Sequence, residues 1–129
     1  MYFYIPNVWK LPVQFIRDSS NFIHIHLPNV EELGTSVFYN SKLEYARFDN
    51  LKTINNTVFQ KCNNLKILDL HKCPDLVTLT SANSLTETNN VKISEDLKIF
   101  LNKDNEDKFK SDPKWKTVID TYGGNVIFK

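Results

Sequence analysis

The sequence predicts an α/β solenoid, in which short units stack into a coil with one short parallel sheet and a helical cap at the C-terminal end. Three observations predict this fold. An apolar pattern returns at a nearly constant spacing, each unit is too short to bury its own apolar edge, and helix and turn signals follow residue 97. Units of this kind are stabilised by stacking on their neighbours.

The repeat becomes visible when the sequence is compared with itself. A shift by one unit aligns Phe22 with Leu43, Leu27 with Phe48, Val30 with Leu51, Leu33 with Ile54, Val37 with Val58 and Phe38 with Phe59. The same comparison places residues 27–30 on residues 5–8, and it places Leu65, Leu68 and Leu70 on Leu43, Ala46 and Phe48. About four units therefore occupy residues 1–80, and Phe38 is expected to lie above Phe59 in a common interior.

Each unit has two halves with different apolar spacing. The first half ends in alternation, which is typical of a short strand with one face inward. In the second half Val30, Leu33, Val37 and Phe38 follow the spacing of a short helical or irregular turn. Pro28 separates the halves because proline cannot continue a strand ladder. Strands of successive units should therefore align into one sheet.

Residues 81–96 and 97–129 differ from the array. Residues 81–96 are polar and rich in turn formers, which predicts a loop or a degenerate repeat. In residues 97–129, which we expect to form a capping unit, Asn102 or Asp104 can cap a short helix that runs through Lys110 with Phe109 as its apolar anchor.

A second helix is expected from Pro113 to about Tyr122. Proline suits the first turn of a helix, and Gly123-Gly124 can end it. Residues 126–128 are then a last strand. The two helices would cover the apolar edge that the final unit otherwise exposes to water.

The units resemble the BspA-type leucine-rich repeats, a family of bacterial surface proteins and of some protozoan and phage proteins. The resemblance covers roughly residues 2–80. It is carried by Phe22, Ile25, Leu27, Pro28, Leu33 and Phe38, by Leu43, Phe48, Ile54, Phe59 and Cys62, and by Leu65, Leu68 and Leu70. The tail from Ile99 to Trp115 is similar to the closing unit of such arrays. The resemblance implies a leucine-rich-repeat right-handed superhelix, a role in cell adhesion and a place at the cell surface, or outside the cell, as part of a larger protein.

The amino end shows no cap before the first strand position, which is occupied by residues 2–5. An uncovered strand edge favours pairing with another chain. Either the chain is cut from a longer array, or its first unit meets a partner domain or a second copy.

Composition excludes several classes of protein. The formal charge of +1, from 16 Lys and Arg against 15 Asp and Glu, gives no general attraction to nucleic acid or to an anionic membrane. No stretch is long and apolar enough for a membrane helix, and the first residues of the chain show no export signal. Two cysteines cannot make a disulfide framework.

The variable strand positions predict the binding surface, because stacked strands align them in columns on the exposed face. One column is Tyr2, His24, Tyr45 and Ile67, and the second is Tyr4, His26, Arg47 and Asp69. Aromatic rings and arginine are enriched at protein interfaces. These eight residues are therefore candidates for binding a protein or glycan partner. In the alternative, neighbouring units pair with each other, Arg47 with Asp69 for example, and the face is only solvated.

Metal binding and catalysis have weaker signals. Cys62, His71 and Cys73 are possible zinc ligands, but their spacing is not a recognised one. Cys62 occupies a small buried position of the repeat, and a disulfide to Cys73 is an alternative outside the cell. A serine with His24 and Asp49 could form a nucleophilic site, but the sequence has no phosphate-binding loop or nucleophile elbow.

We therefore expect a non-catalytic recognition or adhesion module with no cofactor and no metal. A structural or assembly module of a larger surface or phage tail protein is the alternative, with possible self-association through the amino-terminal edge. A hydrolase is the third and weakest interpretation.

Overall fold

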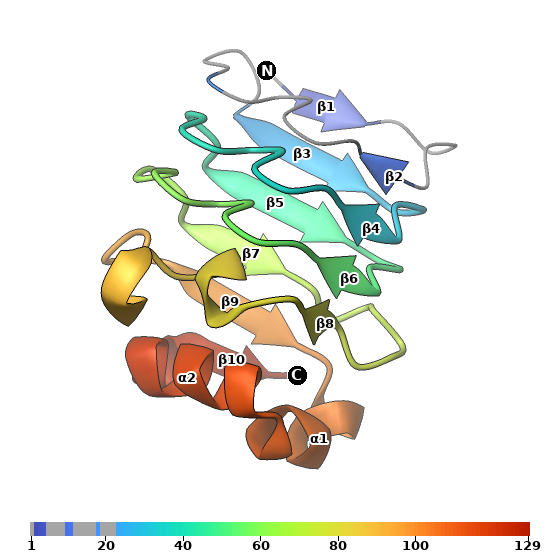
Figure 1. Ribbon diagram of the computed structural model, residues 1–129. Helices are drawn as coiled ribbons and strands as arrows, with labels where there is room; N and C mark the ends of the chain where they lie inside the picture. Colours follow the sequence, from blue (N-terminus) through green and yellow to red (C-terminus); the bar gives the residue numbers. More distant parts are fainter. Residues whose placement is uncertain (1, 5–9, 12–17, 19–22) are drawn as a thin grey trace.

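Short strands of the chain build two parallel sheets, seen in a computed structural model that describes residues 2–4, 10–11, 18 and 23–129 (Figure 1). The first sheet has the order β1-β3-β5-β7-β9-β10 and the second the order β2-β4-β6-β8. Strands of the first sheet are β1 (Tyr2–Tyr4), β3 (His24–Leu27), β5 (Tyr45–Phe48), β7 (Ile67–Asp69), β9 (Lys98–Leu101) and β10 (Val126–Phe128). Those of the second are β2 (Lys10–Leu11), β4 (Glu32–Leu33), β6 (Thr53–Ile54) and β8 (Thr78–Leu79).

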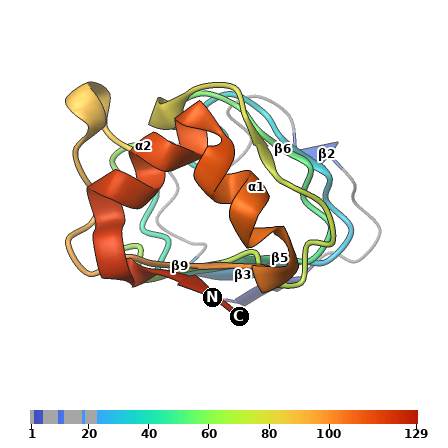
Figure 2. The same cartoon turned by 90° about the horizontal axis from the view of Figure 1, so that it is seen from below.

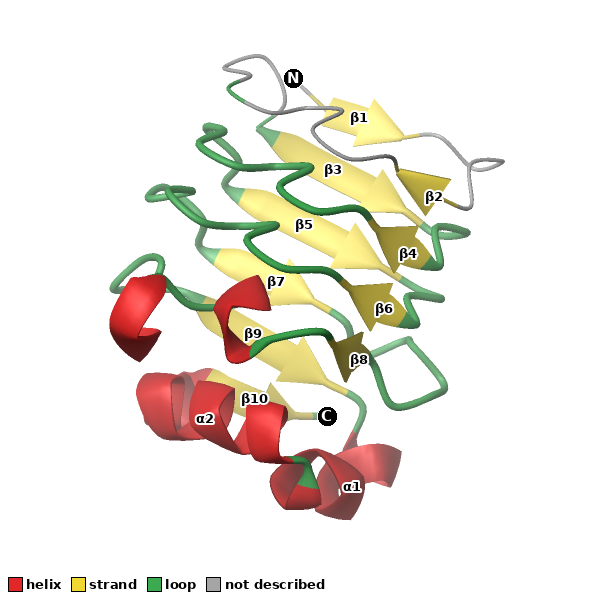
Figure 3. Ribbon diagram, in the orientation of Figure 1, coloured by secondary structure: helices red, strands yellow, loops and turns green. Residues whose placement is uncertain are grey.

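Successive strands lie in the register that the repeat predicts. His24 pairs with Tyr45 and Tyr45 with Ile67, so one repeat along the sequence becomes one step between neighbouring strands. Each unit from β1 to β8, which we call a rung, gives one strand to each sheet, and the rungs lie over one another (Figure 3). β9 and β10 extend the first sheet only. The predicted parallel sheet and C-terminal helices are confirmed.

The expectation of a single sheet was wrong, because the second half of each rung also contains a strand. Glu32 pairs with Thr53 and Leu33 with Ile54, where the apolar spacing had indicated a helical or irregular turn. Strands as short as β4 and β6 cannot show alternation, so sequence periodicity cannot reveal them. Backbone pairing with the next rung extends the chain there, and Leu33 and Ile54 still point into the core.

The core lies between the two sheets and is mainly apolar, with a few buried polar side chains such as Ser41 and Gln60. Phe38 and Phe59 are fully buried, and their rings stack with centroids 5.5 Å apart and planes 23° from parallel. Phe48 lies 6.3 Å from the Phe38 ring. The prediction that Phe38 lies above Phe59 is confirmed, so these two neighbouring rungs bury their apolar edges against each other.

Residues 80–97 pack onto the end of the coil. They contain two 3-10 turns, Ala82–Ser84 and Thr88–Asn90, and their apolar side chains Leu85 and Ile93 are buried. The hydroxyl of Tyr122 donates to the carbonyl of Leu85 at 2.7 Å and accepts from the amide of Ile93 at 3.0 Å. This segment is therefore fixed by the helix that covers it.

Two helices cover that end of the coil, as the view in Figure 2 shows. They are α1 (Glu106–Ser111), after a 3-10 turn at Lys103–Asn105, and α2 (Pro113–Tyr122), before a 3-10 turn at Gly123–Asn125 and β10. Asn102 caps the first turn by accepting from the Asp104 amide at 2.9 Å. Gly123 has a positive φ of 57° at the end of α2. The predicted helix from Pro113 to Tyr122 and the last strand at 126–128 are confirmed.

Aromatic contacts hold the helices to the last rung. The Phe109 and Trp115 rings meet edge to face with centroids 4.8 Å apart, and both side chains are buried. The Trp115 indole N–H donates to the carbonyl of Val77 at 2.6 Å. The Asp112 carboxylate caps α2 by accepting from the amides of Lys114 and Trp115. Covering the apolar end in this way is what a stacked array requires.

Candidate functional site

The outward positions of the six-stranded sheet form two columns, which run across the rungs as expected. Backbone pairing aligns Tyr2, His24, Tyr45 and Ile67, and it aligns Tyr4, His26, Arg47 and Asp69. The backbone of Tyr2 and Tyr4 is described, but their side chains lie outside the described part of the structure. The first column continues at Lys98 and the second at Phe100 and Ile127, three positions that the sequence did not suggest because the last strands follow an irregular spacing.

The first column surrounds a shallow, mainly apolar hollow of about 330 Å³. Its lining residues are His24, Glu44, Tyr45, Lys66 and Ile67. The rings of His24 and Tyr45 meet edge to face, with centroids 6.0 Å apart. Aromatic rings in this arrangement present apolar area with little rotational freedom to lose. The hollow therefore gives the column a place where a partner's side chain or ring could rest.

The second column is polar at His26, Arg47 and Asp69, and the first two of these are organised around Asp49, directly after β5. One carboxylate oxygen of Asp49 accepts from Arg47 Nε at 2.9 Å, and the other contacts His26 Nε2 at 3.0 Å. Burial alone would raise the pKa of Asp49, but the hydrogen bonds and charges of these two neighbours outweigh it and lower the pKa. The hydrogen bond to Asp49 also raises the pKa of Arg47. Asp49 thus holds both side chains in place on the face.

Two pairings that the sequence offered only as alternatives are not formed. Arg47 bonds to Asp49 rather than to Asp69, because the carboxylate two residues further along the chain, just after β5, reaches the guanidinium directly. Asp69 instead accepts from the backbone amide of His71 at 3.1 Å and contacts the His71 ring. The histidine beside Asp49 is His26 rather than His24, whose side chain meets Tyr45.

Cys62 and Cys73 are both buried and both free. The Cys62 thiol donates to the carbonyl of Phe38 at 3.0 Å, and the Cys73 thiol to that of Phe48 at 3.2 Å. Burial raises the pKa of Cys62 to about 11 and that of Cys73 to about 12. Buried thiols of this kind behave as packed apolar groups. Among the described residues, no group of three or more His, Cys, Asp and Glu could hold a metal ion.

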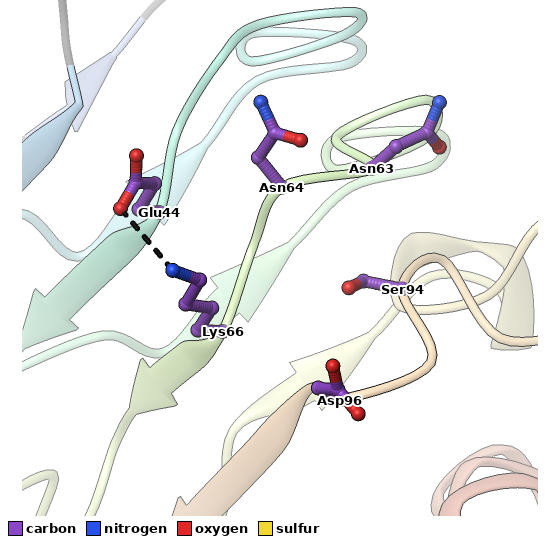
Figure 4. A pocket seen from close by; sticks show the side chains of 6 residues that line it. All are labelled: Glu44, Asn63, Asn64, Lys66, Ser94 and Asp96. Atoms are coloured by element: carbon purple, nitrogen blue, oxygen red, sulfur yellow. Dashed lines mark ion pairs between the residues drawn. The ribbon is translucent and has the colours of Figure 1, made fainter.

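A second hollow of about 330 Å³ lies at the amino ends of β5, β7 and β9 (Figure 4). All its lining side chains are polar: Glu44, Asn63, Asn64, Lys66, Ser94 and Asp96. Glu44 Oε1 and Lys66 Nζ point toward each other and are 3.7 Å apart. Glu44 and Lys66 also line the apolar hollow, so the two hollows adjoin each other. The sequence did not suggest this site, because Asn63 and Asp96 come from different rungs of unequal length.

A third hollow, of about 370 Å³, lies between the turns that follow β3 and β5. It is lined by Asn29, Glu31, Asn50 and Lys52. Lys52 Nζ contacts Glu31 at 2.8 Å, and the Asn50 amide donates to the carbonyl of Pro28 at 2.7 Å. These contacts join adjacent rungs, so we assign the third hollow to the structure of the coil.

Comparison with known proteins gives one match. The family described as "BspA type Leucine rich repeat region (6 copies)" matches residues 5–104. No curated protein and no solved structure matches significantly. Within the part of the chain that the structure describes, no helix is both long enough and apolar enough to cross a bilayer.

Proposed function

Because the chain belongs to the BspA-type leucine-rich-repeat family, we propose that it is a non-catalytic recognition module that binds a partner through the outer face of its six-stranded sheet. Stacked repeats create extended surfaces that many such proteins use for binding. The two columns defined above, Tyr2, His24, Tyr45 and Ile67 with Tyr4, His26, Arg47 and Asp69, are the proposed contact surface.

The observation that carries the proposal is the arrangement of His24, Tyr45 and Ile67 around one hollow, beside the ordered Arg47. Partly exposed aromatic and arginine side chains are the groups that contribute most to protein interfaces. Since Asp49 fixes the Arg47 side chain in the free protein, less side-chain entropy is lost when a partner binds. A protein partner is the class that this composition favours.

The contacts of the polar column suit a binding role. Asp49 uses one carboxylate oxygen for Arg47 and the other for His26, so both side chains are held in place on the outer face. Side chains that are already ordered lose less entropy when a partner binds. Family membership favours a surface location, within a larger adhesion protein, and the general rule for parallel crossovers favours a right-handed coil.

The test is a triple variant, His24→Ala with Tyr45→Ala and Arg47→Ala, compared with the unchanged chain for binding to intact cells and to a panel of purified extracellular-matrix proteins. The matched control is Glu32→Ala with Thr53→Ala and Thr78→Ala, which alters the outward positions of the other sheet. We expect the first variant to lose at least about tenfold in affinity, which is about 1.4 kcal/mol, and the control to lose little. Equal binding by all three proteins would contradict the proposed surface.

The assembly module remains a second candidate because β1 has a single neighbour among the described strands. The backbone groups along the other side of such an edge strand could add a strand from another chain. Light scattering of the purified chain over a range of concentrations distinguishes the two. A concentration-dependent dimer that the triple variant leaves intact, together with unchanged cell binding, would favour assembly.

A further inference from the structure

We propose that the polar hollow lined by Glu44, Asn63, Asn64, Lys66, Ser94 and Asp96 binds a neutral saccharide, whose less polar face rests in the adjoining apolar hollow. This proposal goes beyond the proposed function, because it adds a small ligand, a saccharide, at the edge of the outer face whose columns we propose to bind a protein partner. The hollow lies at the edge of that face, where the turns before β5, β7 and β9 meet (Figure 4).

The polar side chains of this hollow are available for a ligand. Within the described part of the chain, the side chains of Asn63, Asn64, Ser94 and Asp96 make no hydrogen bond to another residue. The contact between Glu44 and Lys66, at 3.7 Å, is longer than a hydrogen bond. Amides both donate and accept, and carboxylates accept at two oxygens. This mixture suits the hydroxyl groups of a sugar, each of which is both a donor and an acceptor.

The charges in the hollow favour a neutral ligand. Glu44 and Asp96 are two carboxylates, and Lys66 is the single cation among the described lining residues. Two carboxylates and one ammonium group leave a net charge of −1, which repels an anion. A metal ion is disfavoured because the described residues contain no group of three or more His, Cys, Asp and Glu that could hold one. A neutral polyhydroxyl compound can bond to all three without a charge conflict.

The apolar hollow supplies the second half of the site. His24 and Tyr45 bring rings to it, and Ile67 brings an aliphatic side chain. One face of a pyranose ring carries mainly C–H groups, which pack well against aromatic rings. The polar hollow alone measures about 330 Å³, at the lower end of the range for ligand sites, so one or two sugar rings would fit.

The third hollow offers a comparison within the same molecule. It has a similar size and also contains amides, a carboxylate and an ammonium group. However, Asn50, Glu31 and Lys52 already bond within the protein, and no aromatic side chain is among its described lining residues. If polarity alone were enough for sugar binding, both hollows would bind equally well.

The experiment is a titration of the full chain with the methyl glycosides of glucose, galactose, mannose and N-acetylglucosamine, followed by the shifts of backbone amide NMR signals. We expect at least one glycoside to bind in the millimolar range, with shifts at residues 63–66 and 94–96 and at Tyr45. The double variant Asn64→Ala with Asp96→Ala should weaken that binding at least tenfold, because both side chains are exposed and carry no structural bond. Tyr45→Ala should also weaken it. The control, Glu31→Ala with Lys52→Ala, should leave it unchanged.

Three results would overturn the saccharide site: no shift with any of the glycosides, equal shifts at Asn29 and Lys52, or unchanged binding by the Asn64→Ala, Asp96→Ala variant. These outcomes are separate from the test of the proposed function. A chain that still binds a matrix protein through its columns, but shifts with no glycoside, would be a recognition module without this sugar site.

Discussion

Asp49 organises the polar column from a single position. Its two carboxylate oxygens contact side chains from two rungs, His26 on β3 and Arg47 on β5, so it joins the strands as well as orienting the charged face. The Asp49 side chain is 21% exposed, which makes these contacts stronger than those of the well-exposed ion pair of α2.

We predict that Asp49→Asn lowers the free energy of unfolding by about 1 kcal/mol at neutral pH. Since the pKa of Asp49 is lowered in the folded protein, its contribution is present above the ordinary aspartate pKa of about 4 and is lost as the pH falls through the lowered value. The difference between the variant and the unchanged protein should therefore shrink in acid. Urea unfolding at neutral pH and at about pH 3 measures it.

The control for Asp49 is Asp120→Asn, which removes an exposed contact with Lys116 on α2. It should change stability by a few tenths of a kcal/mol at most. If Asp49→Asn lowers the free energy of unfolding as much at about pH 3 as at neutral pH, loss of the ion pair is not the cause.

Left-handed backbone positions recur along the rungs. Asp18, Asn40 and Lys61 follow one another at the spacing of the repeat, and all three have φ between 57° and 62°. Asparagine and aspartate tolerate this conformation better than lysine does. The Asn40 amide also donates to Asp18 at 3.0 Å. Of these three residues, Lys61 is therefore the one whose side chain least favours the left-handed backbone conformation.

We predict that Lys61→Gly raises the free energy of unfolding by about 1 kcal/mol, because relief of the left-handed strain outweighs the greater flexibility of glycine in the unfolded chain. The backbone amide of Lys61, which donates to Glu87 at 2.6 Å, is unaffected. Thermal unfolding measures the change. Lys42→Gly is the matched control at an exposed position without a positive φ, and it should destabilise; a loss of stability in both variants would contradict the assignment of strain.

At the scale of elements, α2 contributes most to covering the apolar end of the coil. Trp115 is fully buried between α2 and the last rung, and it contacts Phe109 of α1 as well as the backbone of Val77. A single side chain therefore links both helices to the array.

We predict that Trp115→Ala lowers the free energy of unfolding by about 3–5 kcal/mol, since it removes a large buried ring and leaves the carbonyl of Val77 without its donor. Trp115→Phe should lose less, because most of the packing is kept. Urea unfolding gives both values, and Lys114→Ala on the exposed side should be nearly neutral. Equal losses for the alanine and phenylalanine variants would show that packing of the ring is not the main contribution.

The elements were predictable where their signals are local. Pro113 begins α2 and Gly123 follows its last residue, so its bounds could be predicted from proline and glycine chemistry alone. The very short strands β4 and β6 depend on backbone pairing between rungs, which leaves no period in the sequence. The polar hollow also escaped prediction, because Asn64 and Ser94 come together only after residues 80–97 fold against α2.

At the scale of the whole molecule, the repeat fixes which residues become neighbours. A nearly constant offset between rungs places His24 beside Tyr45 and Tyr45 beside Ile67, so the columns could be predicted without coordinates. Pairs within a rung, such as Arg47 with Asp49, depend on side-chain reach at the end of a strand and were not predicted. The division into an array of residues 1–80, a segment of 81–96 and a cap of 97–129 remains a prediction of the same kind.

The stacking of the whole coil leads to a further prediction. Because each rung contacts only its neighbours, a single rung can be removed without unfolding the others. Deleting residues 43–64 removes one repeat and places Leu65 where Leu43 stood, so β7 should pair with β3 and Ile67 should lie beside His24. We expect a cooperatively folded protein with lower stability, since Phe59 is lost from the stack. Its urea m-value should be smaller by roughly a sixth, in proportion to the residues removed.

The control is deletion of residues 106–127, which has the same length but removes both helices. It should instead expose the apolar end of the core and abolish the cooperative transition. Circular dichroism during urea unfolding measures both, and a chain that is unfolded after loss of residues 43–64 would show that the rungs are not equivalent stacked units.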